Sequence, residues 1–257
     1  MDGFVGSSFA LSIAGIATRG NKPVLVIAEN KQKAEILADD IETFLKIPNH
    51  ADNTSENIAD NNIATAVFLP LKEKSFAKAE DGDAVEVEEK HFALLDKEWG
   101  SRIHVLKELI QPAKRLVIVS SLDAVSQFVP SKELLIERTK TLSVGAKIDI
   151  EELRYFLVEC GYENMPAVDL PCEFAVRGFI LDVFAPDWDE PARIELFGDE
   201  IESIRYFDVA TQRSLKKLST ISITKILPDE IENITLFDYL PNDSPIILVE
   251  PESFAVS

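Results

Sequence analysis

The stretch EFAVRGFILDVF (173–184), followed by PARIELFGDEIESIRYF (191–207), decides the fold of the region around it. In both stretches apolar residues alternate with polar ones, as they do in strands that have one buried and one exposed face. Glycines and prolines interrupt the runs, and Gly198-Asp199 is a hairpin-turn signal. The pattern predicts short antiparallel strands in a small α+β domain.

Continuous aliphatic runs indicate a different architecture in the first part of the chain. They occur at 23–28, 65–71 and 115–120, and such runs suit strands that are covered on both faces. Apolar residues at helical spacing predict helices over 31–45 and 102–110. The alternation of strand and helix predicts an α/β domain with a parallel sheet.

The change of pattern near residue 145 divides the chain. We expect an α/β domain over 1–144, a small inserted α+β domain over 145–218, and a return to the α/β domain over 219–257. The polar run 49–62 predicts a loop, and the acidic segment 72–90 predicts a mobile surface segment. Because a strand-like run closely precedes the last residue, we expect the chain to be part of a longer protein.

Composition narrows the possible partners and the compartment. The net charge of −19 argues against a general nucleic-acid surface, because phosphate binding needs clustered Lys and Arg. The chain has two cysteines but no C-x-x-C, which favours buried thiols over a disulfide framework or a zinc site. Its three histidines are scattered and share no metal-ligand spacing. No apolar run reaches the ~18 residues of a transmembrane helix. We expect a cytoplasmic protein without membrane contact, metal or cofactor.

The segment GFVGSS (3–8) lies where a phosphate-binding loop would lie, before a helix in an α/β setting. A working loop needs a Lys after its second glycine, because the ammonium group reaches the phosphates. No Lys follows Gly6, so we expect a degenerate P-loop-type domain that is not an ATPase. Three carboxylates could suggest a nuclease, but no Lys or His stands beside them in the sequence to complete an acid/base set: Asp182, Glu195 and Asp199.

Arginines stand out against the acidic background of the second region. In a strand over 191–197, Arg193, Glu195 and Phe197 would share one face. An exposed Arg and Phe rimmed by carboxylates are typical of protein–protein hot spots. Alternatively, Phe197 is part of the core and the arginines form ordinary surface ion pairs. The residues alone leave both interpretations open.

The two alternating stretches resemble signatures of a known family. The first is similar to the E-F-x-x-R-G-G-I-x-D-I-F of UvrB and of transcription-repair coupling factors (Mfd), and the second to P-x-R-I-E-F-F-G-D-E-I-x-S-I-R. TQRS (211–214) resembles the T-Q-R-S that favours the coupling factors over UvrB. The resemblance is strong over 160–215 and weaker at Gly3–Ser7. Phe179 departs from the family, which has Gly there.

The resemblance implies a module that copies the first domain of UvrB without its ATPase activity and binds UvrA through a small inserted domain. In the full-length family, the protein displaces stalled RNA polymerase on DNA and recruits nucleotide excision repair. The family's UvrA contacts match Arg177, Arg193 and Phe197 here, and Arg205 is a further candidate. One alternative is a UvrB-like, ATP- and DNA-dependent damage-recognition protein. Another is a relic whose partner surface has changed.

Overall fold

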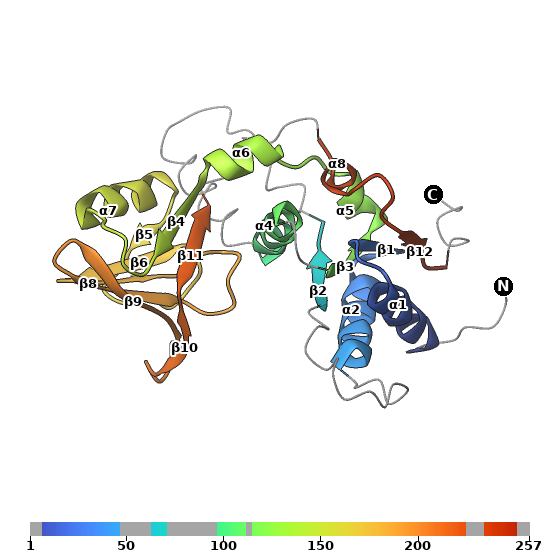
Figure 1. Ribbon diagram of the computed structural model, residues 1–257, viewed down its shortest axis with the longest axis horizontal. Coiled ribbons are helices and arrows are strands. Elements are labelled where there is room, and N and C mark those ends of the chain that lie inside the picture. The colour runs from blue at the N-terminus through green and yellow to red at the C-terminus, as the bar shows by residue number, and fades with distance from the viewer. Residues whose placement is uncertain (1–6, 47–62, 71–96, 112–114, 225–233, 251–257) are drawn as a thin grey trace. The chain divides into compact units, whose positions relative to one another are not determined.

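The computed structural model describes residues 7–46, 63–70, 97–111, 115–224 and 234–250 (Figure 1). The expectations for residues 3–6, the loop 49–62 and the acidic segment 72–90 concern residues outside these ranges. The described chain is mixed α/β and contains both parallel and antiparallel strand pairs. It divides into two compact units: unit 1 comprises 1–71, 101–129 and 233–257, and unit 2 comprises 72–100 and 130–232.

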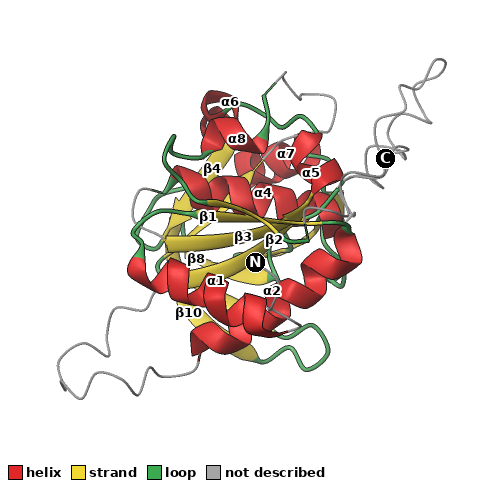
Figure 2. Ribbon diagram, turned by 90° about the vertical axis from the view of Figure 1, so that its right-hand side faces the viewer, coloured by secondary structure: helices red, strands yellow, loops and turns green. Residues whose placement is uncertain are grey.

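Unit 1 is built on a four-stranded parallel sheet with the strand order β12-β1-β3-β2. The strands are β1 (Val24–Ala28), β2 (Ile63–Phe68), β3 (Arg115–Ser121) and β12 (Ile246–Leu248). Helices α1 (Ser7–Arg19) and α2 (Lys31–Lys46) lie together along one face (Figure 2). The three aliphatic runs therefore form parallel strands, as the sequence predicts.

Close packing explains the small side chains of α1 and α2. The residues that the two helices bury against the sheet are mostly alanines at helical spacing: Ala10, Ile13, Ala17, Ala34, Ala38 and Ile41. Leu25 and Ile118 point to the other face of the sheet and are also fully buried. A sheet covered on both faces accounts for runs without polar alternation.

Unit 2 contains a six-stranded sheet with the order β10-β9-β8-β7-β6-β5. Its strands are β5 (Glu163–Asn164), β6 (Glu173–Arg177), β7 (Ile180–Val183), β8 (Ala192–Phe197), β9 (Glu200–Phe207) and β10 (Ser214–Leu218). All neighbouring pairs are antiparallel except β5 and β6. The two alternating stretches thus form consecutive antiparallel strands, as predicted.

Two hairpin turns of this sheet begin with a glycine that has a positive φ. Gly178 (φ 63°) lies between β6 and β7, and Gly198 (φ 65°) lies between β8 and β9. A positive φ at the first of two central residues fits a type II′ turn, and glycine adopts it without steric cost. The predicted turn at Gly198-Asp199 is confirmed.

The remaining elements of the described chain are five helices and two strands, most of them short. They are α4 (Lys97–Ile110), α5 (Leu122–Ser126), α6 (Lys132–Glu137), α7 (Ile150–Glu159), α8 (Leu236–Tyr239), and strands β4 (Thr139–Ser143) and β11 (Thr220–Thr224). Strand β4 pairs with β11, so residues from both sides of the predicted inserted domain meet within unit 2. The boundaries at 145 and 218 stay predictions. Among the described helices, none is long and apolar enough to cross a membrane.

Candidate protein-interaction site

The central strands of unit 2 have one apolar face and one charged face. On β8, Ile194 and Leu196 are buried, whereas Arg193 and Glu195 are partly exposed. Strand register places Asp182 of β7 directly opposite Arg193, and Arg193 directly opposite Arg205 of β9. The period-two alternation therefore predicted the shared face of Arg193 and Glu195 correctly.

Three groups hold the guanidinium of Arg193. Its Nε and Nη2 donate hydrogen bonds to the two carboxylate oxygens of Asp182 at 2.6 and 2.8 Å. Nη2 also donates to Oε1 of Gln212 at 2.8 Å, and the guanidinium carbon lies 4.4 Å from the ring centre of Phe207. The hydrogen bond to Asp182 raises the pKa of Arg193. Among the described residues, nothing accepts a hydrogen bond from Nη1.

Gln212 is a contributor that sequence reasoning did not identify. It has a φ of 57°, a left-handed conformation that is uncommon for residues other than glycine. Its backbone N–H donates to the carbonyl of Asp208 at 2.8 Å, and its side-chain amide donates to the carbonyl of Val209 at 2.9 Å. This turn fixes the amide oxygen toward Arg193. Its signal in the sequence was the TQRS motif, which indicated a family but no contact.

Arg177 shares the carboxylate of Asp182 with Arg193. Its Nη2 donates to Oδ2 of Asp182, whose side chain is 2% exposed. The Arg177 side chain is 46% exposed, far more than the 14% of Arg193. One buried carboxylate thus serves two cations, and the group of three carries a net positive charge at the surface. A second carboxylate from another protein would complement it.

Arg205 forms a separate ion pair with Glu195. Its two terminal nitrogens donate to the two carboxylate oxygens of Glu195, each at 2.5 Å. Ser203 donates a further hydrogen bond to Glu195 at 2.8 Å. The bonds from Arg205 and Ser203 lower the pKa of Glu195 to about 2. Because both terminal nitrogens of Arg205 are engaged, this residue has fewer donors for a partner than Arg177.

Phe197 ends β8 beside this charged face and is 79% exposed. It borders a shallow cavity of about 280 Å³ with Val144 and Ile201. An aromatic side chain left in water stabilises nothing in the fold, so its exposure argues against the interpretation that Phe197 is part of the core. The structure thus brings Arg177, Arg193 and Arg205 onto one sheet and leaves Phe197 exposed at the end of β8, a central strand of that sheet.

The carboxylates considered as nuclease candidates have other partners in space. Asp182 and Glu195 accept from arginines, as described. No Lys stands near Asp199 in the sequence, but in three dimensions the Nζ of Lys147 lies 3.0 Å from its Oδ2. Both members of this pair are largely exposed, which is typical of a surface ion pair of small energy. In the described ranges, no group of three or more metal-ligating residues occurs.

Comparison with known proteins identifies relatives of the chain. Residues 141–228 match the family described as the UvrB interaction domain. The chain is 28% identical over 222 residues to the transcription-repair-coupling factor of Bacillus subtilis, which covers 86% of the chain and 16% of that relative. It is 30% identical over 223 residues to the UvrABC system protein B of Thermosipho africanus, covering 86% and 31% respectively.

A more similar relative matches a shorter part. The transcription-repair-coupling factor of Staphylococcus aureus strain RF122 is 42% identical over 123 residues, which is 48% of the chain and 10% of the relative. The chain therefore spans less than one third of the length of each of these relatives. Two of these three relatives are transcription-repair-coupling factors by name.

Proposed function

We propose that the chain, whose residues 141–228 match the UvrB interaction domain and which is similar to transcription-repair-coupling factors and to UvrABC system protein B, is a non-catalytic module that binds UvrA. The binding site consists of Arg177, Arg193 and Phe197, with Arg205 in an indirect role. As part of a longer protein, the module would recruit nucleotide excision repair to stalled RNA polymerase, with the polymerase and DNA held by other domains.

The observation that carries this proposal is the arrangement around Asp182. Two guanidinium groups converge on one buried carboxylate, and one of them, Arg193, is held in place by Asp182, Gln212 and Phe207. A preorganised arginine loses little side-chain entropy when it binds a carboxylate on a partner. Phe197 supplies the apolar contact that usually accompanies such charge-assisted bonds at a hot spot.

Arg205 has an indirect role in this proposal. Its bidentate bond to Glu195 neutralises the carboxylate nearest to Arg193 on β8. Without Arg205, Glu195 would compete with an acidic partner group for Arg193. Arg205 therefore belongs to the site through the charge that it cancels.

Binding isotherms with purified UvrA test the proposal. Phe197→Ala and Arg177→Ala should each weaken binding by about 2 kcal/mol or more, or about thirtyfold in Kd. Both side chains are exposed, so the variants should remain folded. Leu215→Ala is the matched control, because Leu215 is 54% exposed on β10 and lies outside the site. Unchanged affinity in both folded variants would contradict the site assignment.

Arg193 needs a parallel stability measurement. Its side chain is mostly buried, and Arg193→Ala leaves Asp182 with Arg177 alone. Loss of one partner of a buried pair costs about 3–5 kcal/mol of folding free energy. A weaker isotherm for Arg193→Ala therefore supports the proposal only where urea unfolding shows that the variant is folded at the temperature of the titration.

A UvrB-like ATP-dependent protein is the alternative function, and the similarity to UvrABC system protein B is its support. Against it stands the absence of Lys after Gly6 in the sequence. A titration with a fluorescent ATP analogue separates the two functions. Micromolar or tighter binding would favour the UvrB-like protein. No binding to ATP together with no binding to UvrA would favour a relic.

A further inference from the structure

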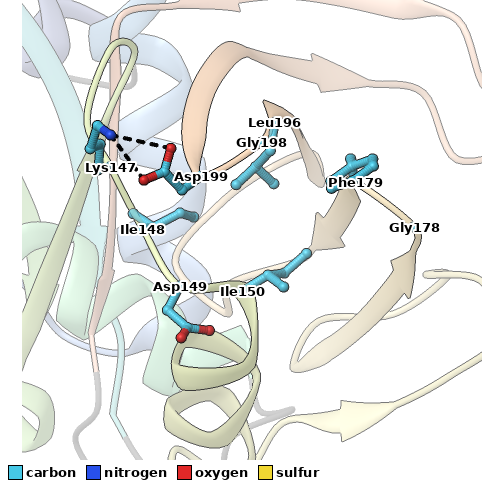
Figure 3. A pocket seen from close by; sticks show the side chains of 9 residues that line it. All are labelled: Lys147, Ile148, Asp149, Ile150, Gly178, Phe179, Leu196, Gly198 and Asp199. Atoms are coloured by element: carbon cyan, nitrogen blue, oxygen red, sulfur yellow. Dashed lines mark hydrogen bonds and ion pairs between the residues drawn. The ribbon is translucent and has the colours of Figure 1, made fainter.

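A cavity of about 500 Å³ lies beside the two glycine-containing hairpin turns of unit 2 (Figure 3). Its apolar lining comes from three different segments: Ile148 and Ile150 at the start of α7, Phe179 in the β6–β7 turn, and Leu196 on β8. The volume falls within the ~300–1,000 Å³ that is usual for binding pockets. The cavity is thus large enough to receive apolar side chains of another molecule.

Phe179 forms one wall of this cavity and is 64% exposed. The turn needs a positive φ only at Gly178, so nothing in its backbone geometry requires an aromatic residue at the next position. Exposure of a phenylalanine to water carries a hydrophobic cost of up to ~1.5–3 kcal/mol relative to its burial. The fold therefore gives no reason for Phe179, whereas a contact with another protein would.

The charged groups at the rim of the cavity have partners within unit 2. Lys147 forms an ion pair with Asp199, as Figure 3 shows. The carboxylate of Asp149 accepts hydrogen bonds from the backbone N–H groups of Glu151 and Glu152 at 2.8 and 3.2 Å, where it caps α7. Because these charged groups already have partners within unit 2, the apolar wall and floor are the part of the cavity that a ligand would contact.

The cavity lies at the same end of the sheet as two residues of the site of the proposed function, Arg177 and Phe197. The backbone N–H of Leu196 donates to the carbonyl of Phe179 at 2.9 Å, so the β6–β7 turn is fastened to the residue that precedes Phe197. Arg177 stands two positions before Phe179 on the same hairpin. In the strand order β8-β7-β6, the turn that carries Phe179 lies between the end of β6, with Arg177, and the end of β8, with Phe197.

We propose that Phe179 and this cavity form a second, apolar contact area for UvrA, in which Phe179 packs against an apolar side chain that UvrA inserts. This inference rests on the proposed function and adds a specificity-determining residue to it. Arg177 and Arg193 recognise acidic groups, and the cavity recognises an apolar group next to them. Aromatic anchors in such positions contribute a large share of binding energy at protein interfaces.

Calorimetric titration of the full chain with purified UvrA tests the inference in four variants. Phe179→Ala should raise Kd at least about tenfold, whereas Phe179→Leu, which keeps an apolar wall, should stay within about threefold. Phe197→Ala reports on the proposed function, and Leu215→Ala is the control for removal of an exposed apolar side chain outside the site. Circular dichroism establishes that each variant is folded.

The outcomes separate the two claims. If Phe197→Ala loses affinity and Phe179→Ala binds within twofold of the unaltered chain, the inference is wrong and the proposed function stands. If Phe179→Ala and Phe179→Leu lose affinity equally, the apolar wall is not what UvrA recognises, and the inference is also wrong. If the unaltered chain does not bind UvrA, both claims fail. Loss in Phe179→Ala with retention in Phe179→Leu supports the inference.

Discussion

Asp182 is the residue on which the charged face depends. Its carboxylate is buried on β7 and accepts hydrogen bonds from Arg177 and Arg193. Asp182→Asn would leave two guanidinium groups without their counter-charge, and breaking a buried pair costs about 3–5 kcal/mol. We expect Asp182→Asn to lower the free energy of unfolding, measured in urea, by about 3 kcal/mol.

Asp199→Asn is the matched control for that experiment. Asp199 also pairs with a cation, Lys147, but both side chains are more than 60% exposed. Exposed ion pairs contribute little to stability, because water and salt screen them. A loss of stability in Asp182→Asn no larger than in Asp199→Asn would show that the Asp182 cluster does not hold the sheet face together.

Gln212 offers a test of how Arg193 is held. Asn tolerates the left-handed conformation at position 212, but its side chain is one methylene shorter and should not reach Arg193. A lost hydrogen bond of this kind is worth about 1 kcal/mol. Gln212→Asn should therefore lower the free energy of unfolding in urea by about 1 kcal/mol, and, because Arg193 is then less firmly held, it should also weaken UvrA binding in calorimetry. Affinity equal to that of the unaltered chain would remove Gln212 from the site.

Glu195 makes the stability of unit 2 sensitive to acid. Arg205 and Ser203 lower the pKa of Glu195 from 4.5 to about 2, so the folded state favours the charged carboxylate. The resulting stability is present above about pH 4.5 and is lost as the pH falls toward 2. Glu195→Gln should lose less stability than the unaltered chain between these pH values, measured by urea unfolding at each pH. An identical pH dependence in both proteins would contradict this.

At the scale of elements, the sequence predicted which residues form strands and share a strand face. It predicted less well which side chains form ion pairs with one another. Period-two alternation identified the strand of Arg193 and the face that it shares with Glu195, because that pattern is a local property of the backbone. The convergence of Arg177 and Arg193 on Asp182 depends on the register of three strands, which no local pattern encodes. The pairing of Lys147 with Asp199 is more distant still in sequence.

Two glycines in different elements should respond in opposite ways to alanine. Gly198 has a φ of 65° in the β8–β9 turn, so a Cβ is strained there although no atom lies within 4 Å of it. Gly15 lies within α1, where an added Cβ also meets nothing within 4 Å. We expect Gly198→Ala to destabilise by about 1 kcal/mol and Gly15→Ala to stabilise by about 0.5–1 kcal/mol.

Thermal and urea unfolding of the two variants test whether Gly198→Ala lowers stability and Gly15→Ala raises it. The glycines differ in backbone conformation and share open surroundings, so the comparison isolates the backbone contribution. Stabilisation by Gly198→Ala would mean that the turn does not hold the positive φ in solution. The end of β8 that carries Phe197 would then be less fixed than the hairpin geometry indicates.

At the scale of the whole molecule, connectivity was the least predictable feature. The aliphatic runs correctly indicated a parallel sheet, yet its order β12-β1-β3-β2 combines strands from the two ends of the chain. The pairing of β4 with β11 likewise joins residues about eighty positions apart. Such contacts are set by how the elements pack and not by the composition of either strand.

Net charge makes a prediction for the whole chain that separates a protein-binding module from a DNA-binding one. The chain carries a net charge of −19, and the three arginines of the site, Arg177, Arg193 and Arg205, are already paired with carboxylates. Non-specific DNA binders reach a Kd of ~10⁻⁴–10⁻⁶ M, and lower salt strengthens their binding. We expect fluorescence anisotropy with single-stranded DNA to show no binding below ~100 μM, at low salt as well as at physiological salt, because repulsion between the chain and the phosphates also grows when screening falls.

The exposed pair Lys216 and Lys217 on β10 is the place where a local exception would arise. Micromolar binding that strengthens at low salt and disappears when both lysines are changed to Glu would overturn the expectation and favour a UvrB-like role on DNA.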